Sequence, residues 1–401
     1  MITIEATNNI QQGLNPAPRL ISLGNKAALT GSRVSTTRSL LKDLPSAEQA
    51  SNDFYGIIEA EKRQESTVRI QDLRMADTGH ITRGAGMLTI SPEALGQMLA
   101  RTSFPEATAA ATYLTAIPAN RRAKEFNAII NGYADDEQEI VLRHRLNILD
   151  NGSTAGRGIY AAVSDRYIVQ DAHTVLANFV QQLLDSNTYE ANDLRMSLLS
   201  DSIRTEALIH YKTGTVAGEE HSAYFRFRTG DSGKHAHSGE FGVFRLVCSN
   251  GLTVANPWLS STVRHSGNNS RTLVERMLKV GPAVLSLFST QWEQATNTTL
   301  EQFVDGLPQE GSTDYIINGV YRGLLNDTNL SLPGYRGDKA VDEFTKAWEK
   351  EPVTTKAGII NGITRAAHET PLLSMWSAED VQAAAGRILA STRKVQFAHE
   401  E

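Results

Sequence analysis

The chain has 401 residues, of which 40% are apolar and 21% charged, and its formal net charge is −6. These fractions are typical of a globular protein and exclude a disordered or fibrous chain, while the length allows two or three domains. No apolar run approaches the roughly 20 residues that a membrane-spanning helix needs, and the N-terminus lacks the features of a signal peptide, so we expect no membrane partner. The single cysteine, Cys248, cannot form an intramolecular disulfide, which favours a cytoplasmic protein.

Residues 1–65 are predicted to form a loosely ordered N-terminal arm. Asn, Gln, Ser and Thr are frequent there, and Pro16 and Pro18 interrupt its early part. A short helix is predicted near Ala47–Lys62.

Residues 66–290 are predicted to form the core domain. Met87–Ile90 is typical of a short strand. Ser91 follows as a helix N-cap, with proline at the first helical position and glutamate after it. A second helix is expected over Arg121–Asn131, ending at Gly132 as a left-handed cap.

The middle of the core domain is predicted to be mostly strands, with a helix over Asp171–Asp185. The expected strands are Ile140–Leu149, Gly158–Ser164, Arg204–Lys212, Ala223–Arg228 and Phe241–Cys248. Arginines alternate with aromatic residues in the fourth of these. The period of two places Arg226 and Arg228 on one face and Phe225 and Phe227 on the other.

Residues 291–401 are predicted to be a mainly helical C-terminal region. Before it, Ser270–Asn297 has helical spacing that Pro282 kinks or breaks. Further helices are expected at Phe344–Lys350 and Ser377–Arg393, the latter capped by Ser377. The fold class is therefore α+β: a curved antiparallel sheet with helices packed on one side, followed by helices.

Several catalytic motifs are excluded. The chain has no phosphate-binding loop of the G-x-x-x-x-G-K-[ST] type and no H-E-x-x-H helix. Gly230–Gly233, with the letters GDSG, resembles the nucleophile segment of trypsin-like serine proteases. That family needs its histidine upstream in an Ala-Ala-His setting, whereas here Ala-Ala-His ends at His368, downstream. We therefore expect no catalytic residues of this kind and no cofactor.

Histidines gather in the middle of the chain, where seven of the ten lie between residues 140 and 266. His235 and His237 could form an imidazole–carboxylate metal site with nearby residues of the sequence, namely Glu219, Glu220, His221 and Glu240. The alternative is a hydrated polar loop between two strands.

Basic residues are also dense here. Residues 140–280 contain 15 Lys and Arg against 13 Asp and Glu, a balance of +2 that leaves −8 for the rest. Guanidinium groups can follow phosphates while aromatic rings stack on bases, so a sheet face with both suits single-stranded nucleic acid. The candidate binding residues are Arg143, Arg145, Arg166, Tyr167, Arg226, Arg228, Arg245, Arg264 and His265. The alternative is that the aromatic residues face the core and the arginines only solvate an outer face.

Two segments carry a family resemblance: Gly158–Tyr167, and Phe244–Leu252 followed by Arg264–Asn268. They resemble the phage- and plasmid-associated family catalogued as domain of unknown function 932, as does the run Ile90–Leu99. The likeness spans about residues 70–290. It implies a protein of a mobile genetic element, and it carries over no catalytic residues.

Our first hypothesis is a non-enzymatic protein that binds single-stranded nucleic acid in replication, recombination or annealing. It would act as a homo-oligomer through an open sheet edge. The alternative is a protein-binding factor that antagonises host defence, which suits the net charge of −6. A second alternative is a metal-dependent hydrolase or nuclease built on His235 and His237.

Overall fold

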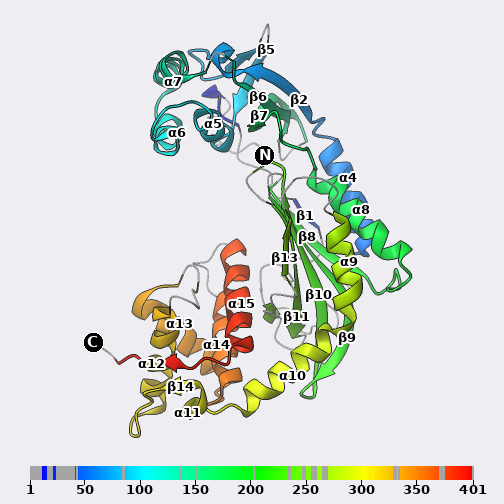
Figure 1. Ribbon diagram of the computed structural model, residues 1–401, viewed down its shortest axis with the longest axis vertical. Coiled ribbons are helices and arrows are strands. Elements are labelled where there is room, and N and C mark those ends of the chain that lie inside the picture. Colours follow the sequence, from blue (N-terminus) through cyan, green and yellow to red (C-terminus); the bar gives the residue numbers. More distant parts are fainter. Residues whose placement is uncertain are drawn as a thin grey trace.

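The computed structural model describes residues 11–15, 21–23, 41, 44–83, 86–135, 137–149, 152–201, 204–233, 236–245, 250–253, 260–263, 270–327, 332, 335–369 and 375–399. Figure 1 shows a curved molecule in which a small N-terminal sheet with its helices lies at one end. A larger sheet runs along the middle, and helices of the C-terminal region lie at the other end.

The small sheet has six strands in the order β2-β6-β7-β5-β4-β3. Its strands are β2 (Gln64–Arg69), β3 (Arg74–Met75), β4 (Ile81–Arg83), β5 (Gly86–Ile90), β6 (Glu139–Ile148) and β7 (Thr154–Ser164). All pairs are antiparallel except β5 with β7. A short 3₁₀ helix, η1 (Ile70–Asp72), follows β2, and the helices α5 (Pro92–Leu99), α6 (Ala107–Ala116) and α7 (Ala119–Tyr133) share the apolar core of this sheet.

The larger sheet is antiparallel, with the order β1-β8-β9-β10-β11-β12 and β13 paired to β11. Its strands are β1 (Ile21–Leu23), β8 (Arg195–Ser200), β9 (Arg204–Val216), β10 (Glu219–Gly230), β11 (His237–Arg245), β12 (Asn250–Thr253) and β13 (Ser260–Val263). The helices α4 (Ala47–Glu59), α8 (Ala172–Asp185) and α9 (Ser270–Val280) cover one face of it (Figure 1).

Aromatic packing explains why this face of the larger sheet is buried. Phe225 and Phe227 on β10 point toward α8, where their rings lie 5.2 and 5.7 Å from the ring of Phe179. All three side chains are at most 1% exposed. Stacked aromatic pairs at such distances add to the hydrophobic gain from burying large rings. The predicted alternation in β10 is confirmed, because Arg226 and Arg228 lie on the opposite face.

The C-terminal region is mainly helical, as predicted. The chain leaves α9 through a 3₁₀ turn, η2 (Gly281–Ala283), into α10 (Val284–Asn297) and α11 (Leu300–Phe303). The further helices are α12 (Thr313–Asn326), α13 (Gly337–Trp348), α14 (Lys356–Glu369) and α15 (Met375–Ala390), with a parallel pair β14 (Val304–Asp305) and β15 (Val395–Gln396). Their apolar faces continue the core of the larger sheet.

The local signals at helix ends gave mixed results. Ser91 caps α5, since its Oγ accepts the N–H of Ala94 at 3.0 Å, and Pro282 does separate two helices. The predicted cap at Gly132 is wrong, because α7 continues to Tyr133. The predicted cap at Ser377 is also wrong, because α15 begins at Met375. No helix in the described residues is both long and apolar enough to cross a membrane.

Part of the family-like segment Phe244–Leu252 lies in the larger sheet. Asn250 and Gly251 begin β12 and pair with Arg245 and Phe244. Cys248 lies outside the described residues. Within the predicted N-terminal arm, α4 packs against the larger sheet and buries Phe54.

Candidate functional site

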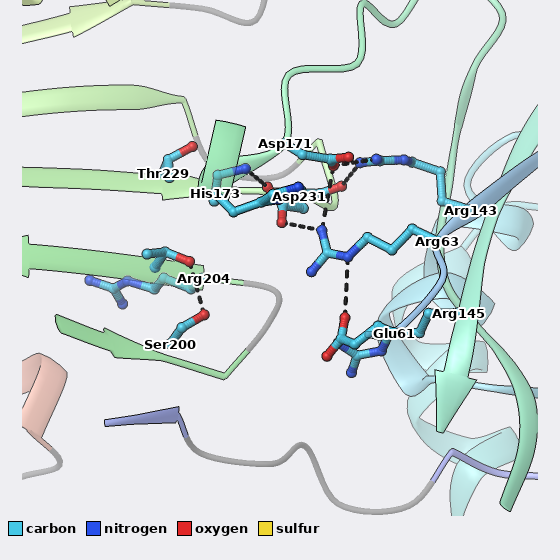
Figure 2. A network of polar contacts seen from close by, with 12 residues as sticks. Glu61, Arg63, Arg143, Arg145, Asp171, His173, Ser200, Arg204, Thr229 and Asp231 are labelled. Atoms are coloured by element: carbon cyan, nitrogen blue, oxygen red, sulfur yellow. Dashed lines mark hydrogen bonds and ion pairs between the residues drawn. The ribbon is translucent and has the colours of Figure 1, made fainter. Parts of the chain in front are cut away.

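A buried network of arginines and carboxylates joins the small sheet to the larger one (Figure 2). Arg63, just before β2, donates to the carboxylates of Asp231 and Asp171, the latter at 3.4 Å. Asp231 lies in the turn between β10 and β11, and Asp171 is the N-cap of α8. Asp231 also accepts the N–H of Ala172, at 2.7 Å. A carboxylate from another element thus satisfies a free N–H at the α8 N-terminus.

Arg143 on β6 extends this network. It donates to the side chain of Asp171 and to the backbone carbonyl of Asp231, and its Nε donates to Glu65 at 3.1 Å. Its side chain is 1% exposed. Charge-assisted bonds of this kind are about twice as strong as neutral ones, so Arg143 ties β2, β6, α8 and the β10–β11 turn together.

Three guanidinium groups surround the phenol ring of Tyr160 on β7. The groups of Arg63, Arg143 and Arg145 lie 5.2, 5.3 and 5.5 Å from the ring centroid. Arg145 also pairs with the carboxylate of Glu61 at 3.0 Å. Burial raises the pKa of Tyr160 to about 12 despite the nearby arginines, so the phenol is neutral at physiological pH.

The residues of the network shift one another's pKa values and so keep one another ionised. Burial alone would raise the pKa of Asp171, but the charges of Arg143 and Arg63 outweigh it and hold that pKa below its usual range. Burial would lower the pKa of Arg143, but the Tyr160 phenol and the carboxylates of Asp171 and Asp231 outweigh that effect and raise it. These groups therefore remain ionised at neutral pH and act as a salt-bridged joint.

The segment Gly230–Gly233 is the part of this joint that sequence reasoning missed. In the sequence alone, its GDSG letters indicate only a resemblance to a protease motif. In the structure the carbonyl of Ser232 accepts from Gln97 on α5 at 2.6 Å. Gly233 has φ +76, and a Cβ there would lie 3.1 Å from Val163, so glycine fits this turn. The motif docks one sheet onto the other.

The joint changes the interpretation of Arg143 and Arg145. Both were predicted to contact nucleic acid, but both side chains are buried and paired with carboxylates. Their carboxylate partners include Asp171 for Arg143 and Glu61 for Arg145, which lie 28 and 84 residues away in the chain, so the residues around β6 do not indicate them.

Arg226 and Arg228 lie on the polar face of the larger sheet, opposite the aromatic core. Arg226 is 1% exposed, with its Nε 3.3 Å from Glu206 and its Nη1 3.5 Å from Glu240. Gln382 on α15 accepts from Arg226 at 3.3 Å. Arg228 donates to Glu206 at 2.8 Å. The alternative of a solvated arginine face is therefore wrong for Arg226, because a C-terminal helix reaches this face.

The remaining predicted residues are spread apart or lie outside the described residues. Arg166 is exposed between β7 and α8, and Tyr167 beside it is half-buried. Arg245 lies at the end of β11. The side chain of Arg245 and the whole of Arg264 and His265 are outside the described residues.

The predicted metal ligands do not assemble within the described residues. His237 is fully buried, and its ring nitrogens lie 2.6 Å from Thr229 Oγ1 and 2.7 Å from Gln170 Oε1. His235 is outside the described residues. No three His, Cys, Asp or Glu side chains in the described part of the chain come together as a metal site would require.

A cleft of about 480 Å³ opens where β8, β9 and β10 meet. Its volume lies in the range of small-ligand sites, about 300–1,000 Å³. Its described lining residues are Leu41, Asn192, Asp193, Arg195, His210, Tyr211, Lys212, Thr213 and Ser222. The cleft was not predictable from the sequence, because three strands and two segments outside them supply its lining, and these residues form no recognised motif.

The cleft carries a net positive charge from its side chains. Arg195 and Lys212 are cationic and Asp193 is its one carboxylate among the described lining residues. Arg195 donates to the carbonyl of Leu44 at 3.3 Å and Lys212 to that of Pro282 at 3.3 Å. A guanidinium has five N–H donors and an ammonium three, so both can also donate to a ligand.

His210 and Ser222 form the polar floor of the cleft. His210 Nδ1 lies 3.1 Å from Ser222 Oγ across the β9–β10 pair. Burial lowers the pKa of His210 to about 4, so its ring is neutral at pH 7. The pair is buried and adds no charge to the cleft. The arrangement can bind an anionic group at Arg195 and Lys212 with polar, uncharged groups beside it.

Residues 160–303 match the model of the family described as Domain of unknown function (DUF932). The match covers a little over a third of the chain and includes Tyr160, Asp171, Asp231 and most of the cleft. It supports the resemblance noted from the sequence and brings no activity with it. Searches of curated proteins and of solved structures found no match.

Proposed function

We propose that this protein binds single-stranded nucleic acid without cleaving it, and that the cleft on the polar face of the larger sheet is the point of contact. In this proposal Lys212 and Arg195 neutralise phosphate, and the exposed Thr213 faces the rest of the nucleotide. The residues that carry the proposal differ from those named from the sequence.

One observation carries the proposal: the cleft places two cations and one carboxylate beside a neutral imidazole and hydroxyl groups. Arg143, Arg145 and Arg226 are buried in ion pairs and cannot follow a phosphate backbone in this conformation. Lys212 is exposed, and the cation of a phosphate contact must be accessible to the strand.

The family resemblance adds the biological setting. We propose a protein of a phage or plasmid that acts in replication, recombination or annealing, and its single cysteine suits the cytoplasm. A homo-oligomer formed through a sheet edge is part of this proposal, and β2, which is paired only with β6, is the longest edge strand among the described residues.

The test is a comparison of labelled single strands and duplexes of about 40 nucleotides at low salt, measured by fluorescence anisotropy. We expect the single strand to bind more tightly than the duplex, because bases that are not paired can enter a cleft. Lys212→Glu should weaken this binding roughly tenfold, since it reverses a phosphate contact.

Lys124→Glu is the matched control, because Lys124 is an exposed lysine on α7 in the small sheet's domain. It should leave binding within about twofold of the wild type. No binding by the wild type at low salt would contradict the proposal. The protein-binding alternative would then be tested by a pull-down from nuclease-treated host lysate.

A further inference from the structure

We infer that the cleft holds one nucleotide at a time, and that a nucleoside 5′-monophosphate binds there as a free molecule. This inference rests on the proposed function, and it adds the size and the chemical class of the unit that is recognised. It concerns the lining of the cleft alone.

The size of the cleft limits its occupant. About 480 Å³ lies in the lower half of the range for small-ligand sites. A ligand of one base, one sugar and one phosphate suits this volume, whereas several stacked nucleotides would need an extended groove. The cleft therefore fits a mononucleotide or a single nucleotide of a longer strand.

The chemistry of the lining fits the parts of a nucleotide. Arg195 and Lys212 provide two cations that can bind a phosphate group. Thr213, which is exposed, provides a hydroxyl group that can donate or accept, as a sugar or a base edge requires. Leu41 adds an apolar side chain that a base can pack against.

The charge of the lining also favours a phosphate monoester over a neutral ligand. The two cations exceed the one carboxylate, Asp193, and His210 stays neutral because it is buried. A neutral nucleoside would leave both cations without a partner in the cleft. We therefore expect the phosphate to contribute a large part of the affinity.

The experiment is isothermal titration of the full-length protein with a nucleoside 5′-monophosphate, with the matching nucleoside and with inorganic phosphate. The mononucleotide should bind, and each of the other two should bind at least about tenfold more weakly because each lacks half of the contacts. Lys212→Glu and Arg195→Gln should both abolish measurable binding of the mononucleotide, whereas Lys124→Glu should leave it unchanged.

A competition assay separates this inference from the proposed function. Free mononucleotide should displace the labelled single strand from the wild type. A protein that binds the strand but not the mononucleotide would overturn the inference and leave the proposed function standing. A protein that binds the mononucleotide but not the strand would contradict the proposed function and leave the inference about the cleft standing. Equal binding of inorganic phosphate and mononucleotide would also overturn the inference, because the cleft would then recognise phosphate alone.

Discussion

At the scale of single residues, Arg226 carries a buried positive charge that balances the negative charge of two carboxylates. Its guanidinium lies between the carboxylates of Glu206 and Glu240. Charge reversal is a suitable test of binding at an exposed arginine. At Arg226 it would place a third carboxylate beside Glu206 and Glu240. Loss of nucleic-acid binding in such a variant would therefore report unfolding.

Arg226→Met should lower the free energy of unfolding by about 2–3 kcal/mol, because it leaves the buried Glu206 with Arg228 as its one remaining cation among the described residues and takes a cation from Glu240. The measurement is urea unfolding followed by circular dichroism. Arg121→Met is the control, since Arg121 is an exposed arginine on α7, and should cost less than about 0.5 kcal/mol. A loss below about 1 kcal/mol for Arg226→Met would contradict the assigned ion pairs.

His210 makes stability depend on pH in a predictable direction. Burial lowers its pKa to about 4, below the value of about 6.5 expected in the unfolded chain. Between these values the unfolded state binds more protons, so stability is fully present above about pH 6.5 and is lost as the pH falls toward 4.

His210→Gln should therefore reduce the loss of stability between pH 7 and pH 4, by up to about 3 kcal/mol relative to the wild type. Denaturant unfolding at several pH values measures this difference. The carboxylates titrate in both proteins, so the comparison isolates the histidine. Parallel stability curves for the two proteins would show that His210 is not held neutral by burial.

At the scale of elements, the β10–β11 turn holds the two sheets together. Asp231 accepts bonds from Arg63 and from the first N–H of α8, while Ser232 Oγ has no hydrogen-bond partner among the described residues. We therefore expect a substitution of Asp231 to lower the stability of the protein and a substitution of Ser232 to have little effect on it.

Asp231→Asn should destabilise the protein by about 1.5–3 kcal/mol, since it removes the most buried of the three carboxylates that pair with Arg63 and leaves Glu61 and Asp171. Hydrogen exchange should become faster at the start of α8, beside Ala172, before it does in the centre of the larger sheet. Ser232→Ala is the control and should change stability by less than about 0.5 kcal/mol. Equal effects of the two substitutions would contradict the assigned roles.

Elements were predictable where the signal is local. The alternation in Tyr224–Arg228 predicted the two faces of β10, and Ser91 with Pro92 predicted the start of α5. The sequence did not show that β6 and β7 belong to a separate sheet from β8–β13, because β6 pairs with β2, far away in the chain. Contacts at the sites were not predictable either, because they join residues that are far apart in the chain. Gln382, which covers Arg226, lies 156 residues after it.

At the scale of the whole molecule, the two sheets have different relations to the proposed function. The small sheet and its helices are fixed to the larger sheet by the buried arginine network, and three of its arginines are used there (Figure 2). The larger sheet has helices on both sides, with the cleft at the β8–β10 end of its polar face. The accessible cations of the cleft, rather than the total of basic residues, define the proposed binding surface.

The most direct test of this account is the salt dependence of single-strand binding by the wild type and by Lys212→Glu. Each phosphate contact contributes about 0.7 to the slope of log affinity against log salt concentration for single strands. We predict a slope smaller by about 0.7 or more in Lys212→Glu, with the affinities of the two proteins converging at high salt. Identical slopes and affinities would show that the cleft does not contact the strand.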